Sequence, residues 1–144
     1  MEPKSHWERV YTSKSSDQVS WFQEHADRSF RLIEEAAKSR TASIIDIGGG
    51  ASTLVDDLLI DRYKSVTVLD LSSAALETAK KRIGPDADRV TWLEANVLTA
   101  ELPRHGFDVW HDRAVFHFLT TEAEREAYVA ATFKAVNSSR KRFA

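Results

Sequence analysis

The stretch that decides the fold of this chain is Ile44-Ile45-Asp46-Ile47-Gly48-Gly49-Gly50. Its first residues form a short apolar run, which is typical of a buried strand, and the glycines predict a tight turn where that strand ends. Further along, Val66-Thr67-Val68-Leu69-Asp70 reads as a second buried strand that ends in a carboxylate. Apolar residues at helical spacing predict a short helix between the two, over residues 52–60. We therefore expect a strand–helix–strand unit of a parallel sheet.

The rest of the chain continues this alternation of helices and strands. Helical spacing, capping residues and stop signals predict further helices at residues 21–39, 72–83 and 121–136. Apolar and β-branched runs predict a third and a fourth strand at residues 90–94 and 107–111. Strands that alternate with helices predict an α/β fold with a mostly parallel sheet.

Length, composition and charge restrict the kind of protein. The 144 residues suit one domain. With a formal net charge of −2, the chain has no overall positive field that would attract nucleic acid or an anionic membrane. No apolar run is long enough to span a bilayer. The absence of cysteine excludes disulfides, thiolate metal sites and cysteine nucleophiles. Because the N-terminus lacks the apolar core of a signal peptide, we expect a cytoplasmic protein.

The glycine turn and the carboxylate after the second strand predict a nucleotide-binding half-site. Glycines let a ligand approach the backbone, and the start of the next helix, near Ser52, favours an anionic ligand group. For a dinucleotide the expected spacing is G-x-G-x-x-G; Gly48 and Gly50 fit it, but Thr53 occupies the third position. Asp70, about 20 residues further on, could accept hydrogen bonds from ribose hydroxyls. The alternative for Asp70 is capping of the following helix.

Four segments follow one another in order along the chain: Ile45–Gly50, Val68–Ser72, Glu94–Val97 and Phe107–Asp112. In the first, one residue separates the acid Asp46 from the glycines. The four segments resemble the motifs of class I S-adenosylmethionine (SAM)-dependent methyltransferases. The resemblance runs from about residue 42 to residue 136. It implies a Rossmann-like three-layer sandwich with strand order 3-2-1-4 and SAM as cosubstrate.

The resemblance also implies a role for each matching residue. Asp46 would bind the ammonium group of SAM directly or through water, and Asp70 would hold the ribose. Asn96 stands where the family usually has aspartate, and its amide oxygen would accept from the adenine amino group. Within the four segments and beside them, the residues implied to hold the cosubstrate are Asp46, Gly48, Gly49, Gly50, Asp70, Leu71, Asn96 and Val97.

The end of the fourth strand is the predicted catalytic region. The resemblance implies that His111 and Asp112 line the methyl-transfer site. For His111 and His117, a general base is one interpretation and a structural hydrogen bond is the other. The spacing of His105, His111 and His117 fits no known metal signature, so we expect no metal site.

Trp7, Tyr11 and Trp21 give the N-terminal segment an aromatic pattern. It resembles the N-terminal segment of small methyltransferases, including lysine methyltransferases that act on translation elongation factors. An aromatic face near the sulfonium cation would stabilise it by on the order of 1 kcal/mol. The alternative is that these rings only pack the N-terminal helix onto the core. We therefore expect residues 1–40 to form a helical segment that covers the cosubstrate.

The C-terminal sequence departs from the family pattern. Family members normally continue after this last helix with a proline-glycine-glycine turn and three more strands, whereas here residues 137–140 read Asn-Ser-Ser-Arg. We therefore expect an incomplete methyltransferase core over residues 41–136, lacking the C-terminal strands of the usual seven, and a disordered tail over 137–144. The fourth strand would keep an unpaired apolar edge, which could support self-association.

The sequence as a whole predicts a SAM-dependent methyltransferase. The acceptor would be a nitrogen, oxygen or sulfur atom of a small molecule or of a protein side chain, with no membrane or nucleic-acid partner. A truncated isoform or fragment that binds SAM without activity is the first alternative. An NAD-dependent oxidoreductase is the second, and Asp46 and Thr53 both count against it.

Overall fold

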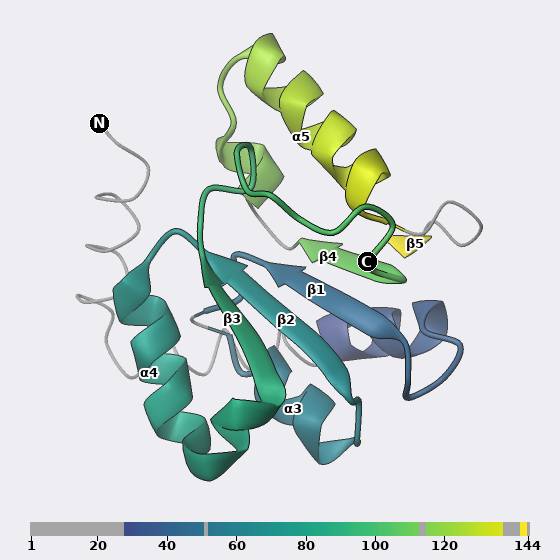
Figure 1. Ribbon diagram of the computed structural model, residues 1–144, viewed down its shortest axis with the longest axis vertical. Coiled ribbons are helices and arrows are strands. Elements are labelled where there is room, and N and C mark those ends of the chain that lie inside the picture. Colours follow the sequence, from purple (N-terminus) through teal and green to yellow (C-terminus); the bar gives the residue numbers. More distant parts are fainter. Residues whose placement is uncertain (1–27, 51, 113–114, 137–141, 144) are drawn as a thin grey trace.

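The computed structural model describes the backbone of residues 28–50, 52–112, 115–136 and 142–143 (Figure 1). Its strands are β1 (Ser43–Ile47), β2 (Ser65–Asp70), β3 (Val90–Glu94), β4 (Val109–Asp112) and β5 (Arg142–Phe143). They form one sheet in the order β3-β2-β1-β4-β5, and every pairing is parallel. The predicted order 3-2-1-4 is therefore confirmed.

Helices connect these strands, and most begin where the sequence predicts. Residues 28–36 are helical, followed by α3 (Leu54–Ile60), α4 (Ser73–Ile83) and α5 (Glu122–Ala135). Two short 3-10 helices complete the described elements, η1 (Gly84–Arg89) and η2 (Val115–Phe118). The Ser72 side chain caps α4, and a capping box of Thr121 and Glu124 opens α5. These starts were predictable because a cap is a local signal.

The helices cover both faces of the sheet. Ile44 packs with the helix at 28–36, with α3 and with α4 in one buried cluster. Ile45 and Ile47 point the other way and pack with α5 in a second buried cluster. Alternate residues of a strand face opposite sides, so one strand fills both cores. Figure 1 shows the sheet between these layers, which confirms the three-layer sandwich.

The fourth strand and the tail differ from expectation. β5 lies beside β4, with Val109 opposite Arg142 and Trp110 opposite Phe143. The predictions of a disordered tail and of an unpaired β4 edge are therefore wrong at Arg142–Phe143; residues 137–141 and 144 lie outside the description. Strands pair through hydrogen bonds between their backbone N–H and C=O groups. A short segment without apolar periodicity can therefore pair with the edge of β4.

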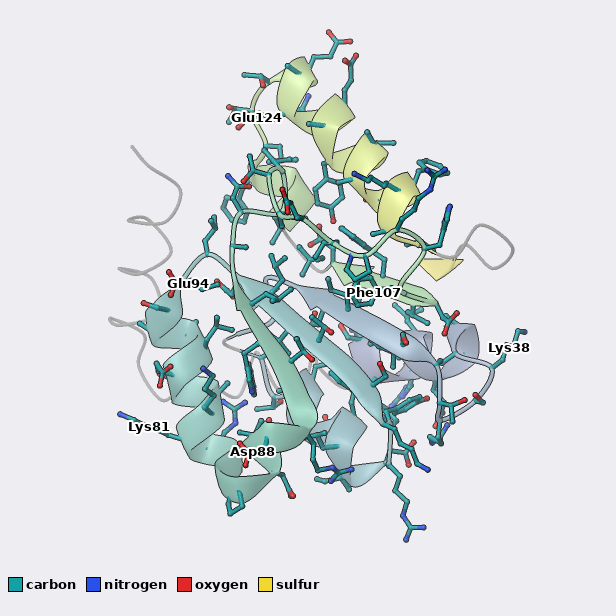
Figure 2. The ribbon with its side chains drawn as sticks, viewed as in Figure 1. Lys38, Lys81, Asp88, Glu94, Phe107 and Glu124 are labelled. Atoms are coloured by element: carbon teal, nitrogen blue, oxygen red, sulfur yellow. The ribbon has the colours of Figure 1, made fainter. Side chains whose placement is uncertain are left out.

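Charged side chains surround this framework. Figure 2 shows Lys38 and Lys81 pointing away from the sheet, and both are exposed. No helix among the described residues is long and apolar enough to cross a membrane.

Candidate functional site

The glycine turn after β1 has little room for side chains. Gly48 has φ +72°, its N–H donates to the Leu69 carbonyl at 2.7 Å, and a Cβ there would lie 2.4 Å from Val115 Cγ2. A Cβ on Gly49 would lie 2.0 Å from Asp46 Oδ2. Both distances are too short for a real Cβ. The turn therefore requires glycine, and the Asp46 carboxylate lies against its backbone.

Asp70 joins the glycine turn to the turn before α4. Its Oδ2 accepts from the Gly50 N–H at 3.0 Å, and its Oδ1 accepts from the Ser72 N–H at 2.9 Å. The side chain is only 3% exposed. The spacing of about 20 residues does bring this carboxylate to the glycines. The local hydrogen bond to Ser72 shows that Asp70 also shapes the entry to α4.

The segment after the glycine turn is anchored by Arg82 of α4. Its Nε and Nη2 donate to the two carboxylate oxygens of Asp56, both at 2.8 Å, and Nη2 also donates to the Ser52 carbonyl at 3.1 Å. The next helix starts at Leu54 rather than near Ser52, whose hydroxyl accepts the Leu54 N–H at 3.0 Å. A bidentate Arg–carboxylate pair fixes geometry well, so it holds α3 against α4.

Asp46 and His111 form a buried pair between neighbouring strands. They are register partners of β1 and β4, and His111 Nδ1 lies 2.8 Å from Asp46 Oδ1. Both side chains are 2% exposed. Among the described residues, the other oxygen of Asp46, Oδ2, has no hydrogen-bond partner. A buried carboxylate oxygen without a donor is costly, so this atom is a candidate to bind a ligand.

His111 and Asp112, for which the resemblance implies a place at the methyl-transfer site, have side chains on opposite faces of the sheet. His111 binds Asp46 on the sheet face that packs against α3, whereas Asp112 binds Tyr128 of α5 on the other face. Consecutive residues of a strand point to opposite faces.

Tyr128 is buried on α5 and was not among the residues predicted for the site. Its hydroxyl donates to Asp112 Oδ2 and accepts from Trp110 Nε1 at 2.9 Å. Asp112 Oδ1 accepts in addition from the Val115 N–H at 2.7 Å. Burial and the nearby Asp112 carboxylate raise the pKa of Tyr128 well above its usual value of 10. This network ties α5 to the end of β4 and to the loop that follows.

The other predicted site residues lie in the segments directly after β2 and β3. Leu71 is half-buried directly after β2. Beyond β3, the Asn96 amide oxygen accepts the Leu98 N–H at 2.9 Å, and the Val97 side chain is buried while its N–H donates to no other described residue. The Ala95 N–H donates to the Asp70 carbonyl at 3.0 Å. This bond brings the loop after β3 to the end of β2, beside the glycine turn.

Several predictions lie outside what the structure describes. Trp7, Tyr11 and Trp21 fall in residues 1–27, and the side chain of His117 is not described either. In the described part of the chain, no three His, Asp or Glu side chains gather as a metal-binding group.

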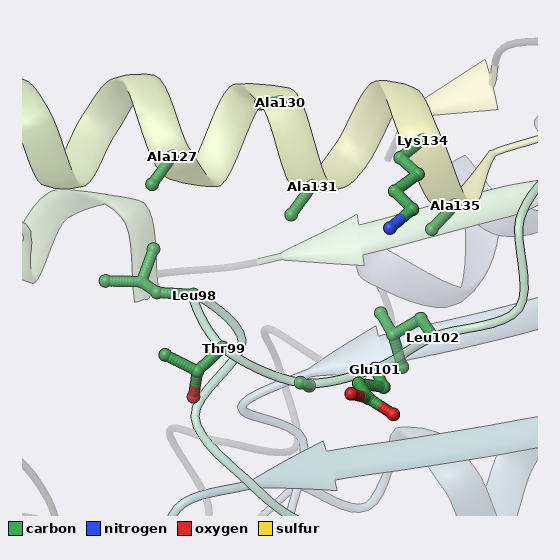
Figure 3. Close-up of a pocket in the computed structure, with 10 residues that line it drawn as sticks. Leu98, Thr99, Glu101, Leu102, Ala127, Ala130, Ala131, Lys134 and Ala135 are labelled. Carbon is green, nitrogen blue, oxygen red and sulfur yellow. The ribbon is translucent and has the colours of Figure 1, made fainter.

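A separate groove of about 620 Å³ lies between α5 and the loop before β4 (Figure 3). Its lining is mostly alanine and leucine, with Glu101 on the loop and Lys134 on α5. None of its lining residues belongs to the predicted site.

Comparison with known proteins shows to which family the chain belongs. A family model described as "Methyltransferase domain" matches residues 44–138. An uncharacterised methyltransferase of Mycobacterium tuberculosis is 32% identical over 88 residues, covering 61% of this chain and 43% of the relative. The EEF1A lysine methyltransferase 2 of Danio rerio is 28% identical over 130 residues, covering 84% and 56%.

Solved structures show the same fold. A TehB-like SAM-dependent methyltransferase from Corynebacterium glutamicum has a TM-score of 0.63 at 25% identity, over 76% of this chain and 56% of that one. The SAM-bound amino pentose methyltransferase CalS10 from Micromonospora echinaspora has a TM-score of 0.57 at 26% identity, over 90% and 51%. The chain thus spans about half the length of the relatives it matches. The matched domain covers most of the chain, which therefore belongs to the methyltransferase domain family, in keeping with its class I SAM-dependent motifs.

Proposed function

We propose that the residues gathered at the carboxyl ends of β1, β2 and β3 bind SAM, and that the domain transfers its methyl group to an acceptor. The observation that carries this proposal is Asp46 Oδ2, a buried carboxylate oxygen that has no partner among the described residues and lies against Gly49. An anionic oxygen at that place suits the ammonium group of SAM. The glycine backbone would lie along the amino-acid part of the same ligand.

The other contacts follow from the order of the strands. Asp70, whose carboxylate accepts from the Gly50 and Ser72 N–H groups, would hold the ribose hydroxyls. Leu71 would lie against the adenine, and the Val97 N–H would donate to the ring. Asn96 keeps an acceptor position on its amide oxygen for the adenine amino group, because one bond to Leu98 uses only one of its two lone pairs.

SAM supplies an electrophilic methyl group when it is bound, so the main task of the protein is to hold two partners close and aligned. The contact between Asp112 and Tyr128 fixes the start of the segment that follows β4. Since β4 is paired with β1, this segment begins near the glycine turn. We propose that this segment faces the acceptor. The aromatic residues Trp7, Tyr11 and Trp21 would cover the cosubstrate from the N-terminal side and exclude water.

The acceptor is a nitrogen, oxygen or sulfur atom on a small molecule or on a protein side chain. Two of the similar proteins are named for amine-bearing substrates, a lysine and an amino pentose. An amine is therefore the first class of acceptor to test.

The test is calorimetric titration of the 144-residue chain with SAM and with NAD, alongside thermal unfolding. Binding of SAM alone supports the proposal, and binding of NAD without SAM contradicts it. Transfer of radiolabelled methyl from SAM to amine acceptors then separates an active enzyme from the inactive SAM-binding alternative. Asp70→Ala should weaken SAM binding by about 1–3 kcal/mol because ribose hydroxyls lose their acceptor. Asp88→Ala, on the exposed helix η1, is the matched control.

A further inference from the structure

The Asp46–His111 pair contains information about the protonation of the histidine. An ionised carboxylate can only accept hydrogen bonds, so the 2.8 Å contact requires the proton of the imidazole to sit on Nδ1. The donated bond then fixes the plane of the imidazole and the rotation of the carboxylate together. Because both side chains are 2% exposed, water does not compete for this bond.

The bond makes the two oxygens of Asp46 different from each other. Oδ1 is occupied by His111, and Oδ2 lies at the Gly49 backbone with no partner among the described residues. Without His111, the carboxylate could rotate and both oxygens would lack a donor.

From this geometry we propose that His111 is a positioning residue rather than the base of the methyl-transfer site. It sets the Asp46 carboxylate so that Oδ2 meets the ammonium of the amino-acid part of the cosubstrate. The inference rests on the proposed function and makes it more specific, because it assigns a residue of β4 to cosubstrate binding. It also explains why a polar pair is kept in the buried sheet, where two apolar residues would pack at less cost.

The experiment compares two ligands that differ in the amino-acid part. S-adenosylhomocysteine carries the ammonium group, and methylthioadenosine lacks the whole amino-acid part. Calorimetry on the full chain should show that His111→Leu weakens S-adenosylhomocysteine binding on the order of tenfold or more. Methylthioadenosine binding should stay within about twofold, because its contacts do not involve Asp46. Equal losses for both ligands would overturn the inference and leave a general structural role.

A pair of amide variants keeps the test informative if His111→Leu fails to fold. The side-chain N–H of asparagine can occupy the place of Nδ1, whereas that of glutamine occupies the place of Nε2. His111→Asn should therefore retain most of the affinity for S-adenosylhomocysteine, and His111→Gln should lose it. The opposite order, or equal affinities, contradicts the inference.

A double-variant cycle tests whether His111 acts through Asp46. Asp46→Asn alone should weaken S-adenosylhomocysteine binding, and adding His111→Leu to it should cause no further loss. Additive losses would show that His111 acts independently. A wild-type chain that binds neither SAM nor S-adenosylhomocysteine would overturn the proposed function itself, a result distinct from those that overturn the role of His111.

Discussion

Although His111 and Asp112 are consecutive residues of β4, their side chains bind partners on opposite faces of the sheet. His111 contacts Asp46 of β1, and Asp112 accepts from the hydroxyl of Tyr128 on α5. The first contact holds the Asp46 carboxylate beside the glycine turn. The second contact ties α5 to the end of β4, where the next loop begins. Two neighbours in the sequence therefore serve two different parts of the site.

Tyr128→Phe should destabilise the protein by about 1–3 kcal/mol, since the buried Trp110 Nε1–H loses its acceptor. Asp112 Oδ2 loses the hydroxyl that donates to it, while Oδ1 keeps the Val115 N–H. Urea denaturation of both proteins measures the difference. Val129→Ala, at an exposed position of the same helix, should change stability by less than about 0.5 kcal/mol. A Tyr128→Phe variant as stable as the control would show that the network contributes nothing to stability.

The raised pKa of Tyr128 predicts a loss of stability at alkaline pH. Burial, first, and then the Asp112 carboxylate disfavour the phenolate in the folded protein, whereas the unfolded chain ionises near the usual value of 10. The stabilisation is therefore complete below about pH 10 and is lost as the pH rises towards the folded pKa. The wild type should lose stability more steeply than Tyr128→Phe between about pH 9 and pH 11. Parallel curves would exclude Tyr128 as the cause.

Gly49→Ala should abolish most of the SAM binding. The new methyl group would lie 2.0 Å from Asp46 Oδ2, so either the turn or the carboxylate must move. We expect an affinity loss on the order of tenfold or more, by calorimetry. Gly84→Ala is the matched control: its φ of +74° strains any alanine, but a Cβ there meets nothing within 4 Å. The control should lose about 1–3 kcal/mol of stability and keep its affinity for SAM.

The elements of the fold were predictable because their signals are local. Apolar runs, glycines and capping residues predicted β1 to β4 and the starts of α4 and α5. β5 was not predictable, because Arg142 and Phe143 join the sheet through backbone pairing with β4, which leaves no side-chain pattern.

The candidate site was predictable in part. Asp46 and the glycines carry a motif, and the structure places the carboxylate against the turn. The contact of Tyr128 with Asp112 was missed because it depends on how α5 packs across β4, and in the sequence Tyr128 is simply one apolar residue of a helix. The separation of His111 from Asp112 could have been found from strand alternation alone.

The capping box of α5 should make the stability of the protein depend on pH in the acid range. Glu124 Oε1 accepts from the backbone N–H groups of Thr121, at 3.1 Å, and Thr120, at 3.2 Å, and these bonds lower the pKa of Glu124. The stabilisation is present above the usual pKa of 4.5 and is lost as the pH falls through the lower folded value. Glu124→Ala should therefore melt at a lower temperature than wild type at neutral pH, and the difference should shrink in acid. Glu126→Ala, exposed on the same helix, is the control. If the difference in melting temperature between Glu124→Ala and wild type does not change with pH, the charge of Glu124 has no part in the cap.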